Sequence, residues 1–115
     1  MSNGPGGMER RRAERVPMPA TGGSIAVVGA RLVNASPYGM MIESPVAMAR
    51  DAQLEVRLIV TGEKVDVLTR VAACTPMPRG ARKVFGIGLE FTRIPDEVRE
   101  RIRELLAFRA PARTA

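Results

Sequence analysis

The stretch Gln53-Leu-Glu-Val-Arg-Leu-Ile-Val60 carries the pattern on which the fold depends. Apolar and charged residues alternate along it, so that side chains of one kind share one face of an extended chain. The apolar face consists of Leu54, Val56, Leu58 and Val60, and the charged face of Glu55 and Arg57. This alternation predicts a strand with one buried face.

The segments that follow repeat this pattern. Thr61-Gly-Glu63 predicts a hairpin turn. The next predicted strand has an apolar face, and Pro76-Met-Pro-Arg-Gly80 is expected to end it; that face is formed by Val65, Val67, Thr69, Val71 and Ala73. A further strand is predicted at residues 84–91, with Phe85, Ile87, Leu89 and Phe91 facing inward. Gly86 and Gly88 on its other face suggest the close approach of another segment.

Upstream, the chain again predicts strands and turns. Val16-Pro-Met-Pro19 is extended because its two prolines restrict the backbone. After the turn signal Thr21-Gly-Gly-Ser24 come an apolar run at 25–33, a polar corner at 34–39 and a second apolar run at 40–42. Five or six short strands with tight turns indicate an all-β fold, a small six-stranded antiparallel barrel.

Near the C-terminus the apolar period changes from that of a strand to that of a helix. The helix is predicted at 95–108, with Pro95 at its first position and an apolar stripe expected to dock on the barrel: Val98, Ile102, Leu105 and Leu106. Glu97 and Arg101 form a favourable pair one turn apart, whereas Arg99 and Arg103 repel each other.

Together these patterns predict one domain. Residues 1–8 are expected to be disordered, residues 9–16 to form an arm, residues 17–92 the barrel, and residues 109–115 a flexible tail. Hydrophobic residues make up 45% of the 115 residues, which is enough for one modest core.

Composition excludes several kinds of chemistry. The chain has one cysteine and no histidine, so it cannot build a zinc site of the usual nitrogen and sulfur type or a Ser-His-Asp centre. We expect Cys74 to be a small core residue. No carboxylate pair or nucleophile stands in a recognisable arrangement, and we therefore expect no enzyme activity and no cofactor. No apolar run is long enough to cross a membrane and no secretory signal is visible, which predicts a cytoplasmic protein without membrane insertion.

Two short segments combine into a candidate ligand site. The arm Glu9-Arg-Arg-Arg-Ala-Glu-Arg15 offers guanidinium groups, which pair with phosphate or with the O6 and N7 atoms of guanine. The corner Asn34-Ala-Ser-Pro-Tyr-Gly39 offers polar side chains and a small residue. By composition, Ser36-Pro-Tyr-Gly39 predicts a type I turn. Taken together, the two segments suit a ligand that contains both guanine and phosphate.

The order Arg11-x-x-x-Arg15 and Asn34-x-Ser36-x-x-Gly39 resembles the PilZ family of bacterial cyclic di-GMP receptors. That family has an Arg-x-x-x-Arg motif before its barrel and an Asp/Asn-x-Ser-x-x-Gly motif at a strand end. Phe85-Gly-Ile-Gly-Leu-Glu-Phe91, followed by an amphipathic helix, is also similar to the family. The resemblance covers nearly the whole chain and implies a PilZ-like barrel with a C-terminal helix.

The resemblance also implies roles for individual residues. Arg11 and Arg15 would clamp guanine and phosphate, Asn34 and Ser36 would bond the other edge of the ligand, and Gly39 would shape the turn. In the family, an arginine at the position of Arg10 accompanies two stacked ligand molecules per site. Asn34 stands where the family more often has Asp. The implied function is to bind cyclic di-GMP and to relay it, through a change of conformation, to an unidentified effector protein.

Two other functions remain open. A PilZ-like adaptor would bind only protein, independently of nucleotide. A small barrel that binds nucleic acid would need a basic groove with aromatic residues. Residues 16–108 carry twelve basic and ten acidic residues, and aromatic residues make up only 3% of the chain. We therefore expect no nucleic-acid partner.

Overall fold

The structure, a computed structural model, describes residues 16–17 and 24–114. The described part contains seven strands and one helix. They are β1 (Val16–Pro17), β2 (Ile25–Val27), β3 (Arg31–Ser36), β4 (Gly39–Ser44), β5 (Gln53–Val60), β6 (Glu63–Arg79), β7 (Arg82–Arg93) and α2 (Asp96–Thr114).

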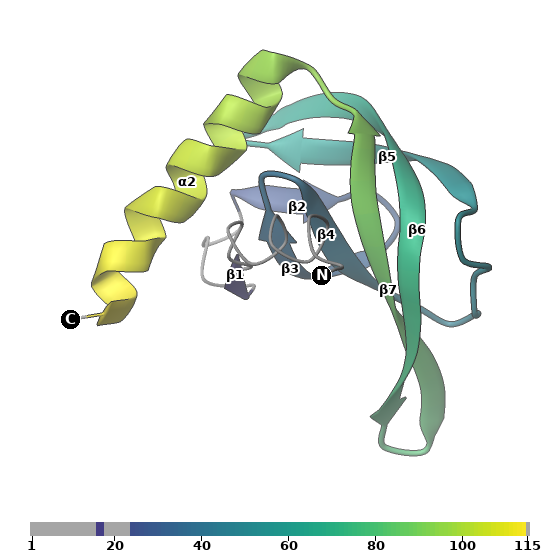
Figure 1. Cartoon of the computed structure of the whole chain (residues 1–115). Helices are drawn as coiled ribbons and strands as arrows, with labels where there is room; N and C mark the ends of the chain where they lie inside the picture. The colour runs from purple at the N-terminus through teal and green to yellow at the C-terminus, as the bar shows by residue number, and fades with distance from the viewer. Residues whose placement is uncertain (1–15, 18–23, 115) are drawn as a thin grey trace, which may run out of the picture.

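The strands form one antiparallel sheet in the order β1-β3-β4-β7-β6-β5-β2. β2 ends one side of this sheet and β3 lies near the other, yet a tight turn at Gly29 joins the two strands directly. Gly29 has a φ of 83°, a conformation that glycine adopts at little cost. Because the short turn draws both sides together, the sheet curls into the nearly closed six-stranded barrel (β2 to β7) visible in Figure 1. The predicted barrel is confirmed in the described part of the chain.

The predicted faces of β5 and α2 are confirmed. Val56, Leu58 and Val60 of β5 are buried, as are Val98, Ile102 and Leu106 of α2, and all belong to one core cluster. The helix lies across one side of the barrel in Figure 1 and covers the core there. Cys74 is half-buried and packs against this cluster, as expected.

The apolar run at 25–33 is two strands rather than one, because the turn at Gly29 divides it. The polar corner predicted at 34–39 is also shorter in the structure. Asn34, Ala35 and Ser36 lie in β3, and only Pro37 and Tyr38 form the turn. The prediction failed here because one glycine is enough to reverse a chain whose flanking residues all favour strands.

β6 differs from its prediction in two respects. A β-bulge between Val71 and Ala73 reverses the inward and outward faces, so Ala73 is exposed and Cys74 faces the core instead. The strand also continues past Pro76 and Pro78 to Arg79. Beyond Arg70, β6 has no β5 residue opposite it, and proline is tolerated on an edge strand of this kind.

The helix is longer than predicted. It begins at Asp96, with the carbonyl of Pro95 accepting hydrogen bonds from the amides of Val98 and Arg99, both at 3.0 Å. It continues beyond residue 108 to Thr114, through the segment predicted to be a tail. Residues 1–8 lie outside the described residues, and so does most of the arm at 9–16.

Candidate functional site

β1 brings the end of the predicted arm to the strand-end motif, Asn34-x-Ser36-x-x-Gly39. Val16 pairs with Ala35, and Pro17 pairs with Asn34. Arg15 is covalently joined to Val16, and consecutive Cα atoms are about 3.8 Å apart. The residue that follows Arg15 in sequence is therefore paired with the strand that carries the motif. The side chains of Arg10, Arg11 and Arg15 lie outside the described residues.

A β-bulge in β3 determines where Asn34 points. Leu32 pairs with Ile42 and Asn34 with Met41, so Val33 is an extra residue in β3. In a regular strand without the bulge, Asn34 would share the inward direction of Leu32, because side chains two positions apart lie on the same face. With it, Ala35 enters the core and the half-buried Asn34 lies on the outer face of the barrel.

Ser36 is buried, and its hydroxyl group bonds the neighbouring turn. It accepts a hydrogen bond from the amide of Tyr38 at 3.2 Å and donates one to the carbonyl of Gly39 at 3.4 Å. These contacts confirm the turn predicted at Ser36–Gly39. They also give Ser36 a structural role that sequence reasoning did not foresee. A hydroxyl oxygen has two acceptor lone pairs, so one position is left for the predicted ligand contact.

The structure shows one requirement for glycine at position 39, and the predicted role of Gly39 in shaping the turn stays a prediction. It is the first residue of β4, and its φ is not among the positive values of the described residues. A Cβ atom at this position would lie 2.3 Å from the carbonyl oxygen of Leu89 in β7. Glycine therefore allows β4 and β7 to approach each other directly beside the motif.

A row of small and flexible side chains extends from Asn34 across the outer face of the barrel. Asn34 pairs with Met41, Met41 with Gly88, and Gly88 with Ala73. Close approach was predicted at the two glycines of β7. It is clearest at Gly86, where a Cβ atom would lie 2.4 Å from the sulfur of Met77. The surface beside Asn34 thus has few branched side chains and carries no charge along this row.

The acidic group nearest to Gly39 in the sheet is held in an ion pair. Gly39 pairs with Glu90, whose carboxylate binds Arg70, and Arg70 also donates to Asp51 at 2.6 Å. The hydrogen bond that Arg70 donates to Asp51 is the main cause that raises the pKa of its guanidinium group, followed by the hydrogen bond that it donates to Glu90. Because Glu90 shares Arg70 with Asp51, this ion pair reduces the negative charge of Glu90 close to a site proposed for phosphate.

Sequence reasoning missed the groups that hold the turn from the helix. Arg99 donates to the carbonyl of Pro37 at 2.8 Å, and its guanidinium carbon lies 5.0 Å from the centre of the Tyr38 ring. Arg103 donates to the Tyr38 hydroxyl at 3.2 Å. The sequence signal available was two arginines one helical turn apart, which by itself predicts only mutual repulsion.

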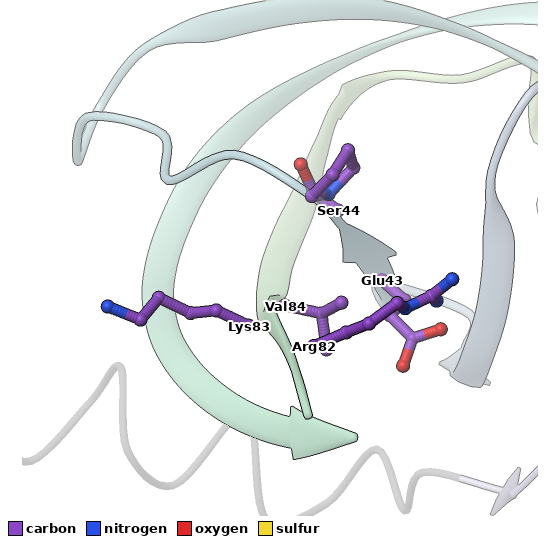
Figure 2. Close-up of a pocket in the computed structure, with 6 residues that line it drawn as sticks. Glu43, Ser44, Arg82, Lys83 and Val84 are labelled. Carbon is purple, nitrogen blue, oxygen red and sulfur yellow. The ribbon is translucent and has the colours of Figure 1, made fainter. Parts of the chain in front are cut away.

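A pocket of about 540 Å³ lies elsewhere, where β4 and β7 diverge. Figure 2 shows Arg82 beside Glu43 and Lys83 pointing away; the full lining is Glu43, Ser44, Pro45, Arg82, Lys83 and Val84. The pKa of Glu43 is lowered, chiefly by its hydrogen bond from Arg79 at 2.5 Å. Ser44 and Gly39 occupy opposite ends of β4, about 17 Å apart at the usual rise per residue. The pocket is therefore separate from the strand-end motif.

The described residues contain no group of three or more His, Cys, Asp or Glu side chains that could hold a metal ion. In the same part of the chain, no helix combines the length and the apolar character needed to cross a membrane.

The architecture defines a class: a small antiparallel barrel with a C-terminal helix docked on its core and an N-terminal strand paired to β3. The family model of the PilZ domain matches residues 9–108, and the chain belongs to this family. No curated protein matches the sequence.

Two solved structures have a similar fold. One is described as the PilZ domain with c-di-GMP of YcgR from Escherichia coli. It has a TM-score of 0.63 and 14% identity, and the match covers 91% of this chain and 95% of that one. The other is the Legionella uncharacterized protein Lpg0364, with a TM-score of 0.52 and 13% identity over 89% of this chain and 99% of that one.

Proposed function

We propose that this protein is a receptor for cyclic di-GMP that binds the messenger between its N-terminal arm and the strand-end motif. The observation that carries the proposal is the pairing of β1 with β3, which joins Val16 to Ala35 and Pro17 to Asn34. This pairing places Val16, the last residue of the predicted arm, beside the strand that carries the motif, which supports the proposal that the two segments form one site. The complex of a similarly folded PilZ domain with c-di-GMP supports the choice of ligand.

In this proposal, Arg11 and Arg15 clamp guanine and phosphate, since a guanidinium group pairs bidentately with either. Asn34 lies on the outer face and bonds the other edge of the ligand. Ser36 contributes its remaining acceptor position, and the row from Asn34 to Ala73 provides an even surface beside the ligand. Arg10 contacts a second, stacked ligand molecule.

The receptor has no catalytic step and no cofactor. Binding draws the arm onto the barrel and changes the surface that an effector protein meets. Because cyclic di-GMP is an intracellular second messenger, the receptor acts in the cytoplasm. It requires neither nucleic acid nor membrane insertion.

Substitution of Arg15 tests the proposal, with affinity for cyclic di-GMP measured by calorimetric titration. Arg15→Ala is expected to lower the affinity by about tenfold to hundredfold, because one bidentate arginine–guanine contact is lost. Its thermal midpoint without ligand should remain that of the wild type. Arg12→Ala is the matched control: it removes the same charge from the same arm but lies outside the motif, and should bind nearly as the wild type does.

Stoichiometry tests the role of Arg10. The wild type should bind two molecules of cyclic di-GMP per chain, and Arg10→Ala one. Equal affinity in Arg15→Ala and the wild type would refute the assigned clamp. If the wild type shows no binding and no thermal stabilisation by the nucleotide, the protein is instead an adaptor that binds only protein.

A further inference from the structure

The β3–β4 turn, Pro37–Tyr38, is fixed from the side of the helix. Arg99 of α2 reaches the carbonyl of Pro37 at 2.8 Å and stacks over the ring of Tyr38, 5.0 Å from its centre. A carbonyl in a two-residue turn has few backbone donors within reach, so a guanidinium group is an effective partner. The same group gains a cation–π contact with the ring. One side chain thus holds both residues of the turn.

Arg103 adds a second contact from the next turn of the helix. It donates to the Tyr38 hydroxyl at 3.2 Å, and its guanidinium carbon lies 5.9 Å from the ring centre. Two like charges one turn apart would repel each other mildly on an isolated helix. Here the negative face of the Tyr38 ring lies close to both guanidinium groups, which offsets that repulsion.

The same turn is fixed from the side of the barrel by the strand-end motif. The amide of Tyr38 donates to the hydroxyl of Ser36 at 3.2 Å, and the carbonyl of Tyr38 accepts from the amide of Phe91 at 2.9 Å. Tyr38 therefore contacts both Ser36, a proposed ligand contact, and the arginines of the helix. It is the one residue through which the proposed site and the helix are linked in these contacts.

Arg99 also lies on a firmly docked part of α2. Val98 and Ile102, on either side of it in sequence, are 4% and 1% exposed and belong to the core cluster. A shift of the turn would therefore change how these arginines are held against the barrel. Tyr38 itself is 47% exposed, so burial in the core does not hold its ring.

We propose that Arg99 and Arg103 are positioning residues of the ligand site, and that through Tyr38 they couple occupancy of the strand-end motif to the docking of α2. This inference rests on the proposed function, since the ligand is cyclic di-GMP. Free-energy coupling between two sites is reciprocal. The helix favours the turn geometry that binds ligand, and bound ligand in turn stabilises the helix in its docked position.

The first test measures the affinity of Arg99→Ala for cyclic di-GMP. Affinity should fall by about tenfold, within the usual range of such coupling. Arg101→Ala is the matched control, because Arg101 lies on the same helix but pairs with Glu63 at 2.6 Å and does not contact the turn. Arg101→Ala should bind as the wild type does. The thermal midpoints of the two variants should fall by similar amounts, so a general loss of stability cannot explain the difference in affinity.

The second test uses Tyr38, the one tyrosine in a chain without tryptophan. Labelling with fluorotyrosine gives a single fluorine NMR resonance, which should shift when cyclic di-GMP binds to the wild type. Tyr38→Phe keeps the ring under Arg99 and should retain most of the affinity. Tyr38→Ala loses both arginine contacts and should match Arg99→Ala. The shift of the Tyr38 resonance on ligand binding is the readout that a purely structural role of the turn would not give.

Hydrogen exchange measures the reverse direction of the coupling. Cyclic di-GMP should slow exchange of the amides at residues 97–107 in the wild type, and much less in Arg99→Ala at the same occupancy. The inference is overturned if the wild type binds the nucleotide while Arg99→Ala binds equally well and helix exchange is unchanged. A wild type that does not bind at all refutes the proposed function instead.

Discussion

The barrel has two tight turns that look alike in sequence but differ in their surroundings. The β3–β4 turn, Pro37–Tyr38, is held by Ser36 on one side and by Arg99 on the other. The β6–β7 turn at Gly80–Ala81 lies at the end of a long hairpin that extends beyond the rest of the barrel in Figure 1. Its flanking residues Arg79 and Arg82 are exposed, and Arg79 binds Glu43 of β4.

This difference shows that turn composition alone does not reveal which turn serves a binding site. Both turns have a proline nearby and a glycine in or directly after the turn, as many turns do. The β3–β4 turn is restrained by neighbours from β7 and α2, whereas the β6–β7 turn is tethered by the ion pair of Arg79 with Glu43. A restrained turn can hold side chains at fixed positions for a ligand, which a protruding turn does less well.

The largest expected effect is that of Gly39→Ala at the restrained turn. A Cβ atom there would lie 2.3 Å from the carbonyl oxygen of Leu89, and a backbone neighbour cannot move aside as a flexible side chain can. The free energy of unfolding should fall by about 3 kcal/mol, measured by chemical denaturation. A loss well below 1 kcal/mol would mean that β4 and β7 can separate at little cost.

A smaller effect is expected of Gly80→Ala at the protruding turn. Gly80 has a φ of 59°, and a Cβ atom there would meet nothing within 4 Å. The cost is therefore conformational, about 1 kcal/mol for a residue with a Cβ in the left-handed region. The same denaturation measurement applies, and affinity for cyclic di-GMP should not change. If Gly80→Ala destabilised the protein more than Gly39→Ala, the contrast between the two turns would be wrong.

The smallest effect is expected of Glu43→Gln, which removes the tether of the hairpin. Arg79 lowers the pKa of Glu43 in the folded protein below its ordinary value of 4.5. The ionised Glu43 carboxylate therefore stabilises the folded protein at neutral pH. This stabilisation is lost as the pH falls below 4.5 and through the lowered pKa of Glu43. The thermal midpoints of wild type and Glu43→Gln should differ slightly at neutral pH and converge in acid.

Asp66→Asn provides the comparison for this tether, because Asp66 binds Arg57 at 2.7 Å on the neighbouring strands and its pKa is lowered mainly by that hydrogen bond. The differences in thermal midpoint between the wild type and each of the two variants should shrink at high salt, as expected for exposed ion pairs. A difference for Glu43→Gln that persists unchanged in acid would show that its carboxylate charge does not matter.

Much of this protein could be predicted from sequence because its signals are local. Alternation of apolar residues predicted β5, the 3.6-residue stripe predicted the docked face of α2, and Ser36-Pro-Tyr-Gly39 predicted a turn. These patterns succeed because side-chain direction follows directly from backbone period. The roles of Arg10, Arg11 and Arg15 remain predictions.

Only the tertiary structure decided the features that depend on neighbours distant in the chain. The bulges at Val33 and near Ala73 each add one residue, which no periodicity reveals, and they set which side chains face outward. Gly39 is required by Leu89, fifty positions later in sequence. Arg99 and Arg103 look mutually repulsive on their own helix, and Tyr38 makes them partners. Such roles arise only when folding brings separate strands and the helix together, since the interaction energy belongs to the pair and not to either segment.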